Sequence, residues 1–246
     1  AIRTSDLATI AVPYIGIACV VLLVLIIVAV TKIPKVQDEI GMTFKESLSK
    51  VFARKPFLPG VLTQMTYVGA QIMCWTAIFQ YVEFLNQSRS AGDQLNDTYW
   101  NMFAMSIFLA GRFIATGLMS KFKPAKLLFI YGIMSVLCCI GAILIPGVPG
   151  LISLVCISMF MSINFPTIYG IALKDMGAEA KVGSAFLVMA IVGGAIFPPI
   201  QGLIIDMGGS GLADTTIMGI PEVKFSFIMP MICLAPVIYY GYVNSK

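Results

Sequence analysis

Seven long apolar stretches recur along the chain, and they limit its fold more than any other feature. Each has about the length, roughly 20 residues, that an α-helix needs to cross a bilayer. Backbone N–H and C=O groups must be paired inside hydrocarbon, so such stretches cross as helices. The predicted spans are residues 10–32, 66–85, 98–120, 127–145, 151–173, 182–205 and 225–242. We therefore predict an all-α fold, a polytopic membrane helical bundle with seven transmembrane helices.

The composition excludes several classes of protein. Of the 246 residues 59% are hydrophobic and 11% charged, whereas a soluble domain has about 25% charged residues. There is no histidine, and the six cysteines lie in apolar runs. We therefore expect no metal site, no cofactor and no enzyme activity. The net charge of +4 comes from bases in loops, so we expect the lipid bilayer, and no nucleic acid, as a partner.

The basic residues are concentrated in one set of loops. The segment 33–56 and the loops after the third and fifth spans hold most of the lysines and arginines. The opposite loops hold only Arg3, Arg89 and Lys224. Because basic short loops stay in the cytoplasm, we predict a bacterial inner-membrane protein with a cytoplasmic C-terminus. Apolar residues at helical spacing within 44–52 further indicate a short amphipathic helix on the cytoplasmic surface.

The second span carries polar side chains along one face. At 100° per residue, Gln64, Tyr67, Gln71 and Trp75 form a narrow stripe. An unpaired amide in hydrocarbon is costly, so such a stripe faces other helices or a watery cavity. Amides with an aromatic ring suit a sugar, whose hydroxyls need hydrogen bonds and whose ring face can stack. The alternative is that the amides only join helices to one another.

Two further spans carry candidate residues for coupling or gating. Asn101 and Arg112 lie close together on the helical wheel of the third span. Arg112 either reaches the membrane surface or pairs with a carboxylate in the cavity. The sixth span contains helix-breaking residues together with an amide, and we expect it to be kinked or locally unwound and to act as a hinge. Its candidates are Gly193, Gly194, Pro198 and Gln201.

Four segments together resemble a known family. They are GAQIMCW at 69–75, AGRFIATGLMSKFKPAKLL at 110–128, MSINFPTIYGIALKDMG at 161–177 and GSAFLVMAIVGGAIFPPIQG at 183–202. In order and spacing they resemble the fucose permease group of the major facilitator superfamily, the sugar:proton symporters. That family encloses a central site between two six-helix halves.

The resemblance implies a domain organisation. Residues 1–32 would be the sixth transmembrane helix, which belongs to the N-terminal half. Residues 33–56 would be the cytoplasmic central loop with its amphipathic helix, and residues 57–246 the C-terminal six-helix domain. The first five helices, which carry the family's proton-coupling carboxylates, would lie outside this sequence. The first residue is Ala1 and not Met, which also suggests a segment of a longer polypeptide.

The resemblance also implies a substrate and its contacts. Gln71, Trp75, Asn164 and Phe165 would contact the sugar, and the stripe adds Gln64. The fucose branch is expected to have Gln and Tyr where Asn164 and Phe165 stand, and Phe suits the glucose and galactose carriers. The implied function is proton-coupled symport of a hexose or 6-deoxyhexose by alternating access. The alternative is a membrane sugar sensor or scaffold subunit that binds without transporting.

Overall fold

The computed structural model describes residues 15–27, 30–31, 44–209, 211–212 and 214–246. The chain divides into two compact units, Ala1–Met42 and Thr43–Lys246. In the first unit the described part contains the apolar helix Ile15–Ile27. This helix lies within the predicted first span, 10–32, most of whose other residues lie outside the described ones.

The second unit is a bundle of helices. They are α2 (Phe44–Ala53), α3 (Phe57–Asn86), α4 (Asp97–Met119), α5 (Pro124–Leu144), α6 (Gly147–Met161), α7 (Asn164–Ala172), α8 (Ala180–Met189), α9 (Gly193–Ile205), α10 (Glu222–Phe225) and α11 (Ile228–Ser245). Short 3-10 turns, η1 (Gly177–Glu179) and η2 (Ala190–Val192), precede α8 and α9. The strands β1 (Thr216–Ile217) and β2 (Ile220–Pro221) form a small antiparallel hairpin between α9 and α10.

The predicted membrane fold is confirmed. Five of the predicted spans are present as helices, or as successive helices, long and apolar enough to cross a membrane. They are Asp97–Met119, Pro124–Leu144, Gly147–Ala172, Ala180–Ile205 and Glu222–Ser245. The predicted span 66–85 lies inside α3, whose 30 residues would extend roughly 45 Å at 1.5 Å per residue. The chain is therefore a multi-pass, all-α membrane protein.

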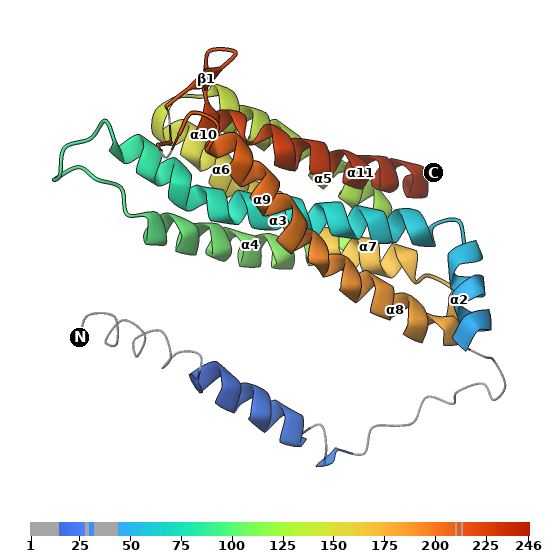
Figure 1. The fold of residues 1–246 in the computed structure, drawn as a ribbon. Coiled ribbons are helices and arrows are strands. Elements are labelled where there is room, and N and C mark those ends of the chain that lie inside the picture. The colour runs from blue at the N-terminus through green and yellow to red at the C-terminus, as the bar shows by residue number, and fades with distance from the viewer. Residues whose placement is uncertain (1–14, 28–29, 32–43, 210, 213) are drawn as a thin grey trace. The chain divides into compact units, whose positions relative to one another are not determined.

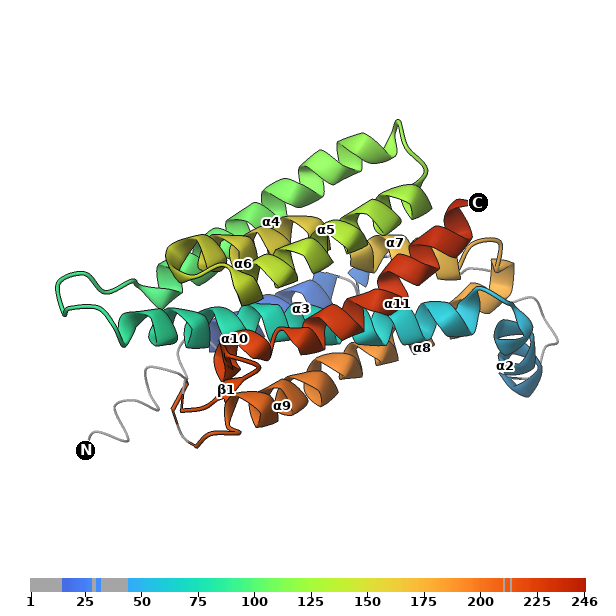
Figure 2. The same cartoon turned by 90° about the horizontal axis from the view of Figure 1, so that it is seen from above.

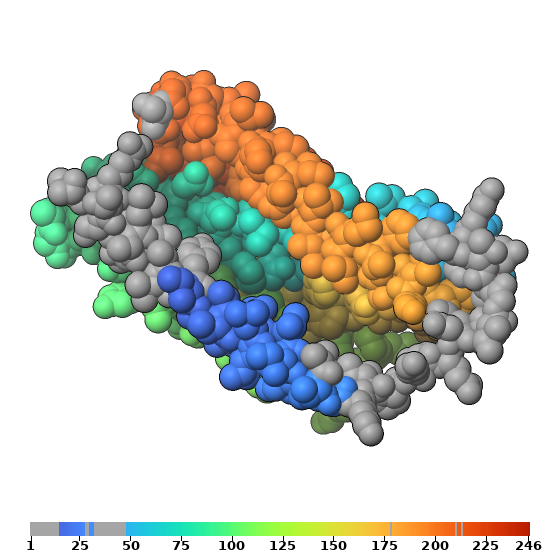
Figure 3. Space-filling model, turned by 60° about the horizontal axis from the view of Figure 1, so that its bottom comes forward, coloured from blue at the N-terminus to red at the C-terminus, as the bar shows by residue number. Residues whose placement is uncertain are grey.

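Helix α3 lies at the centre of the second unit. It packs against α4, α6, α7, α9 and α11, and both ribbon views show it between these helices (Figures 1 and 2). In the space-filling view α9, in orange, lies across the teal α3 (Figure 3). Because neighbours surround α3, buried residues occur all around its circumference. The stripe that the sequence predicts is therefore only one of several faces that pack against other helices.

The fifth predicted span is broken into two helices. Helix α6 ends at Met161 and α7 begins at Asn164. The sequence places the disruption at Pro166, whereas the break lies about one turn earlier, at Ser162 and Ile163. The reason is that a proline ring clashes with the carbonyl four residues before it, which here belongs to Ser162.

The sixth predicted span is irregular just before the expected position. The 3-10 turn η2 ends at Val192, and Gly193 already begins α9. Pro198 lies inside α9. A Cβ atom on Gly193 would collide with the backbone carbonyl of Met65 in α3. Gly193 is therefore required for α9 to cross α3 this closely, whether or not the position also acts as a hinge.

Candidate functional site

The predicted stripe on α3 runs from the packed interior to an accessible position. Gln64 and Tyr67 are fully buried in the bundle, whereas Gln71 and Trp75 are half-buried. The helical period correctly places these side chains on one face. Only the Gln71–Trp75 end of that face is open to a solute without movement of a helix.

Trp75 is held by three neighbouring side chains. Its Nε1 donates to the hydroxyl oxygen of Ser158 in α6 at 3.2 Å. Asn101 in α4 donates from Nδ2 to the carbonyl oxygen of Trp75 at 3.3 Å. The ring of Phe108 meets the Trp75 ring edge to face, with centroids 5.2 Å apart. The contacts with Ser158 and Phe108 orient the indole, as a stacking surface for a ring-shaped solute requires, while Asn101 binds the backbone of the same residue.

Arg112 continues this cluster along α4. Its guanidinium carbon lies 5.0 Å from the centroid of the Phe108 ring. Its Nε donates to the carbonyl oxygen of Ser162 at 3.2 Å. We call Trp75, Asn101, Phe108, Arg112, Ser158 and Ser162 the tryptophan cluster. Phe108 was not predicted, because an apolar residue in an apolar span has no distinguishing signal.

A second group of polar side chains is buried on α3 and α7, two helices that pack against each other. The Tyr67 hydroxyl donates to the carbonyl oxygen of Met161 at 2.7 Å. Beyond this bond lie Gln64, Asn164 and Thr167, which we call the buried polar seam. All three are buried, and their side-chain polar atoms have no hydrogen-bond partner among the described residues. Thr167 is not among the site residues predicted from the sequence.

Phe165 differs from its neighbour Asn164. It is half-buried, and its ring stacks on Tyr169 one turn later, with centroids 6.3 Å apart and planes at 15°. The two rings form an aromatic surface on α7. Of the predicted pair, Phe165 is accessible and Asn164 is not.

The sixth-span candidates lie apart from the tryptophan cluster. Gly194 is close to Val68 and Ile72 on a neighbouring face of α3. Gln201 is buried and donates from Nε2 to the hydroxyl oxygen of Ser226 at 3.2 Å, which ties α9 to the segment after α10. Pro198 is half-buried within α9. The contacts described for Gly194 and Gln201 therefore do not include Gln71 or Trp75.

A cleft of about 380 Å³ lies elsewhere, at the end of α3 and the start of α4. Its lining includes Glu83, Asn86 and Asp97. None of the predicted sugar contacts lines it. Within the described part of the chain, no three His, Cys, Asp or Glu side chains are grouped so as to hold a metal ion.

The arrangement of long apolar helices around α3, which carries polar side chains on one face, agrees with the family expected from the four sequence segments. Residues 6–198 match the family model described as Major Facilitator Superfamily, which is well over half of the chain. The chain belongs to the major facilitator superfamily. The resemblance drawn from the sequence is thereby confirmed.

Several members of the superfamily are similar over nearly the whole chain. The L-fucose-proton symporter of Haemophilus influenzae is 45% identical over 243 residues, covering 98% of this chain and 54% of that protein. The L-fucose-proton symporter of Escherichia coli is 32% identical, covering 100% of this chain and 54% of that protein. A putative glucose/galactose transporter of Helicobacter pylori is 30% identical, covering 99% and 56% respectively.

A solved structure of the superfamily has the same fold. The crystal structure of the Escherichia coli fucose:proton symporter superposes with a TM-score of 0.79 at 31% identity, covering 95% of this chain and 55% of that chain. The chain spans about half the length of the curated relatives that it matches.

Proposed function

We propose that this chain is the C-terminal half of a proton-coupled sugar transporter of the major facilitator superfamily. Its similarity to about half of each symporter supports this assignment. In this proposal residues 1–32 are the sixth helix, 33–56 the central loop and 57–246 the C-terminal six-helix domain. The partner is then an N-terminal half, which supplies the proton-coupling carboxylates and the opposite wall of the sugar site.

The observation that carries the proposal is the fixed, half-buried indole of Trp75 beside the half-buried amide of Gln71. The indole has an apolar face for the ring of a sugar, and the amide both donates and accepts hydrogen bonds. The aromatic surface of Phe165 is a third contact. Relatives are named for L-fucose and for glucose/galactose, so the proposed substrate is a hexose or a 6-deoxyhexose.

We further propose the bacterial inner membrane as the location, with the C-terminus in the cytoplasm. The excess of basic residues in the segment 33–56 and in the loops on the same side supports this orientation. With this orientation α3 runs outward from α2, and the β1–β2 hairpin lies on the external side. Transport then proceeds by rocking of the two halves around a site near the bilayer centre.

Uptake into proteoliposomes tests the proposal. The native polypeptide that carries this sequence is reconstituted, and labelled L-fucose, D-glucose and D-galactose are offered with an imposed proton gradient. We expect accumulation of at least one of these sugars, and we expect an uncoupler to abolish it. Sugar binding without uptake would replace the transporter with a membrane sugar sensor, and neither binding nor uptake would reject the proposed substrate class.

A further inference from the structure

Helix α2 is docked onto the turn between α7 and α8. A small apolar core joins them, in which Val51 of α2 and Phe57 of α3 pack with Met176 and Leu187. The rings of Phe52, Phe57 and Phe186 meet edge to face, with centroids 5.1 to 6.4 Å apart. The contact is therefore specific packing, not a chance touch between a surface helix and a loop.

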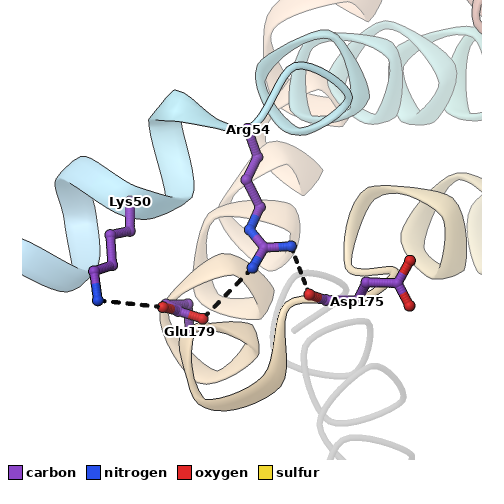
Figure 4. A network of polar contacts seen from close by, with 4 residues as sticks. All are labelled: Lys50, Arg54, Asp175 and Glu179. Atoms are coloured by element: carbon purple, nitrogen blue, oxygen red, sulfur yellow. Dashed lines mark hydrogen bonds and ion pairs between the residues drawn. The ribbon is translucent and has the colours of Figure 1, made fainter.

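Polar contacts also join α2 and Arg54 to the turn between α7 and α8 (Figure 4). The ammonium of Lys50 lies 4.0 Å from one carboxylate oxygen of Glu179, and Nη2 of Arg54 lies 3.8 Å from the other. Nη1 of Arg54 also donates to the carbonyl oxygen of Asp175 at 2.5 Å. The Glu179 side chain is 14% exposed, against 57% for Lys50 and 37% for Arg54. One largely buried carboxylate thus receives both bases.

The turn that these bases contact follows a short helix, α7. Helix α7 has 9 residues, between the break at Ser162 and Ile163 and a turn in which Asp175 has a φ of 59°. Such a φ is uncommon for a residue other than glycine. The Arg54 hydrogen bond falls on the carbonyl of this same residue. A helix with an irregular join at each end can shift as a unit.

The packing of α7 on α3 buries polar side chains that form no hydrogen bond there with any described residue. The Tyr67–Met161 hydrogen bond marks one end of the contact. At the other end a Cβ on Gly60 would lie 2.8 Å from Cβ of Ala172. Between these two contacts, along both helices, lies the buried polar seam. Unpartnered buried amides and hydroxyls oppose this packing. The apolar contacts of Ile168 and Ala172, together with the contacts from α2, offset that cost.

We propose that α2 is a latch on the α7–α8 turn, with Glu179 as the positioning residue, and that its release lets α7 move off α3 and exposes Gln64, Asn164 and Thr167 to the sugar pathway. This inference rests on the proposed transport function for its purpose. The latch explains why two bases converge on one acid in η1, the turn between α7 and α8. It also gives the sealed amides a function in one state of the cycle.

Thiol labelling measures the latch without any sugar. Thr167→Cys is introduced into the native polypeptide in membrane vesicles, because Cys is close to Thr in size. Its reaction with a membrane-permeant maleimide is followed by peptide mass spectrometry, which separates it from the native cysteines. Adding Glu179→Gln should raise the labelling rate about five-fold, the factor that the loss of an ion pair of this kind produces in an opening equilibrium.

Three comparisons make the result specific. Asp206→Asn, which neutralises an exposed acid after α9, should leave the rate unchanged. The exchanged pair Arg54→Glu with Glu179→Arg should return the rate towards the parent value. Cys74, buried in the main core, should stay unlabelled throughout, because its labelling would mean general unfolding. Lys50→Gln is the second variant, with a smaller increase expected, if Glu179→Gln does not accumulate.

The labelling results distinguish the proposed latch from the proposed transport function. Equal labelling in the parent, Glu179→Gln and Lys50→Gln proteins would overturn the latch, and so would labelling of Cys74 in step with position 167. A raised rate that the exchanged pair reverses supports the latch even if no sugar is taken up. In that case only the proposed transport function would fail.

Discussion

Arg112 donates a hydrogen bond from Nε to the carbonyl oxygen of Ser162, over 3.2 Å. In an unbroken helix that carbonyl would accept from the backbone N–H of residue 166, but residue 166 is proline and has none. The arginine therefore replaces the missing backbone donor from another helix. A side chain that looks like a coupling residue in the sequence has a structural contact that ties α4 to the broken span.

Because Arg112 takes the place of the missing backbone donor, the effects of mutating Arg112 and Pro166 on the free energy of unfolding should depend on each other. Arg112→Met should lower the free energy of unfolding by about 1–3 kcal/mol, because the buried Ser162 carbonyl loses its partner. Pro166→Ala restores a backbone N–H, so the double variant should lose less than the arginine variant alone. Thermal unfolding in detergent measures both. Losses that simply add would show that the two residues do not serve the same carbonyl.

The contacts of Trp75 predict separate effects for its ring and its N–H. Trp75→Phe keeps an aromatic face and removes the bond to Ser158, which is worth about 0.5–1.5 kcal/mol. Sugar affinity should then fall by less than about ten-fold, as it should in the matched variant Ser158→Ala. Trp75→Leu removes the face itself and should weaken binding more. Equal affinities of the Phe and Leu variants in a binding titration would exclude stacking on this ring.

Helix α9 packs closely on α3 at Gly69, so a larger residue there should clash with α9. A Cβ atom there would lie 2.8 Å from Cγ and 2.9 Å from Cβ of Phe197. Gly69→Val should destabilise the protein by about 1–3 kcal/mol through overpacking, and Phe197→Ala should relieve part of this loss. Gly117→Ala in α4, where a Cβ meets nothing within 4 Å, is the control and should cost little. A Gly69→Val protein as stable as the control would mean that α9 does not cross α3 here.

Hydrogen bonds to the Glu222 carboxylate should stabilise the loop that follows α9. Its carboxylate is fully buried and accepts from the backbone N–H groups of Gly208 and Asp214, at 2.9 and 3.0 Å. Glu222→Gln replaces one acceptor with a donor facing an N–H group, at a cost of about 1–3 kcal/mol. Limited proteolysis should then cut residues 206–221 faster. The control is Glu83→Gln, which changes an exposed acid. In this variant the protease should cut residues 206–221 at the parent rate. Equal cleavage rates in the Glu222→Gln and Glu83→Gln proteins would contradict this account.

Much of the fold follows from local chemistry. The apolar spans are predictable because hydrocarbon leaves the backbone no alternative to helices. The break near Pro166 is also predictable, since the ring excludes the carbonyl of Ser162. The closeness of Gly193 to Met65 is not, because the sequence does not tell which helices cross. The same holds for the docking of α2, which depends on Glu179, more than a hundred residues later in the chain.

The candidate site is predictable only as a face of one helix. Helical periodicity groups Gln64, Tyr67, Gln71 and Trp75 correctly, but it contains no information about the depth of each side chain. Depth depends on the helices packed around α3, which bury Gln64 fully and leave Gln71 half-buried. The sequence therefore predicts a polar face, whereas the division into an accessible end and a sealed end requires the packing.

The most direct test of the account compares two amides on the same helix. Gln71 and Gln80 are both half-buried in α3, and at 100° per residue they point to opposite sides. Equilibrium binding of labelled L-fucose, D-glucose and D-galactose to the reconstituted native polypeptide is measured for Gln71→Leu and Gln80→Leu. We predict that Gln71→Leu weakens binding of the transported sugar by about ten-fold or more, as expected for a lost hydrogen-bonding group, while Gln80→Leu stays within about two-fold of the parent. Equal affinities for the two variants would contradict the assignment of the Gln71–Trp75 face to the sugar.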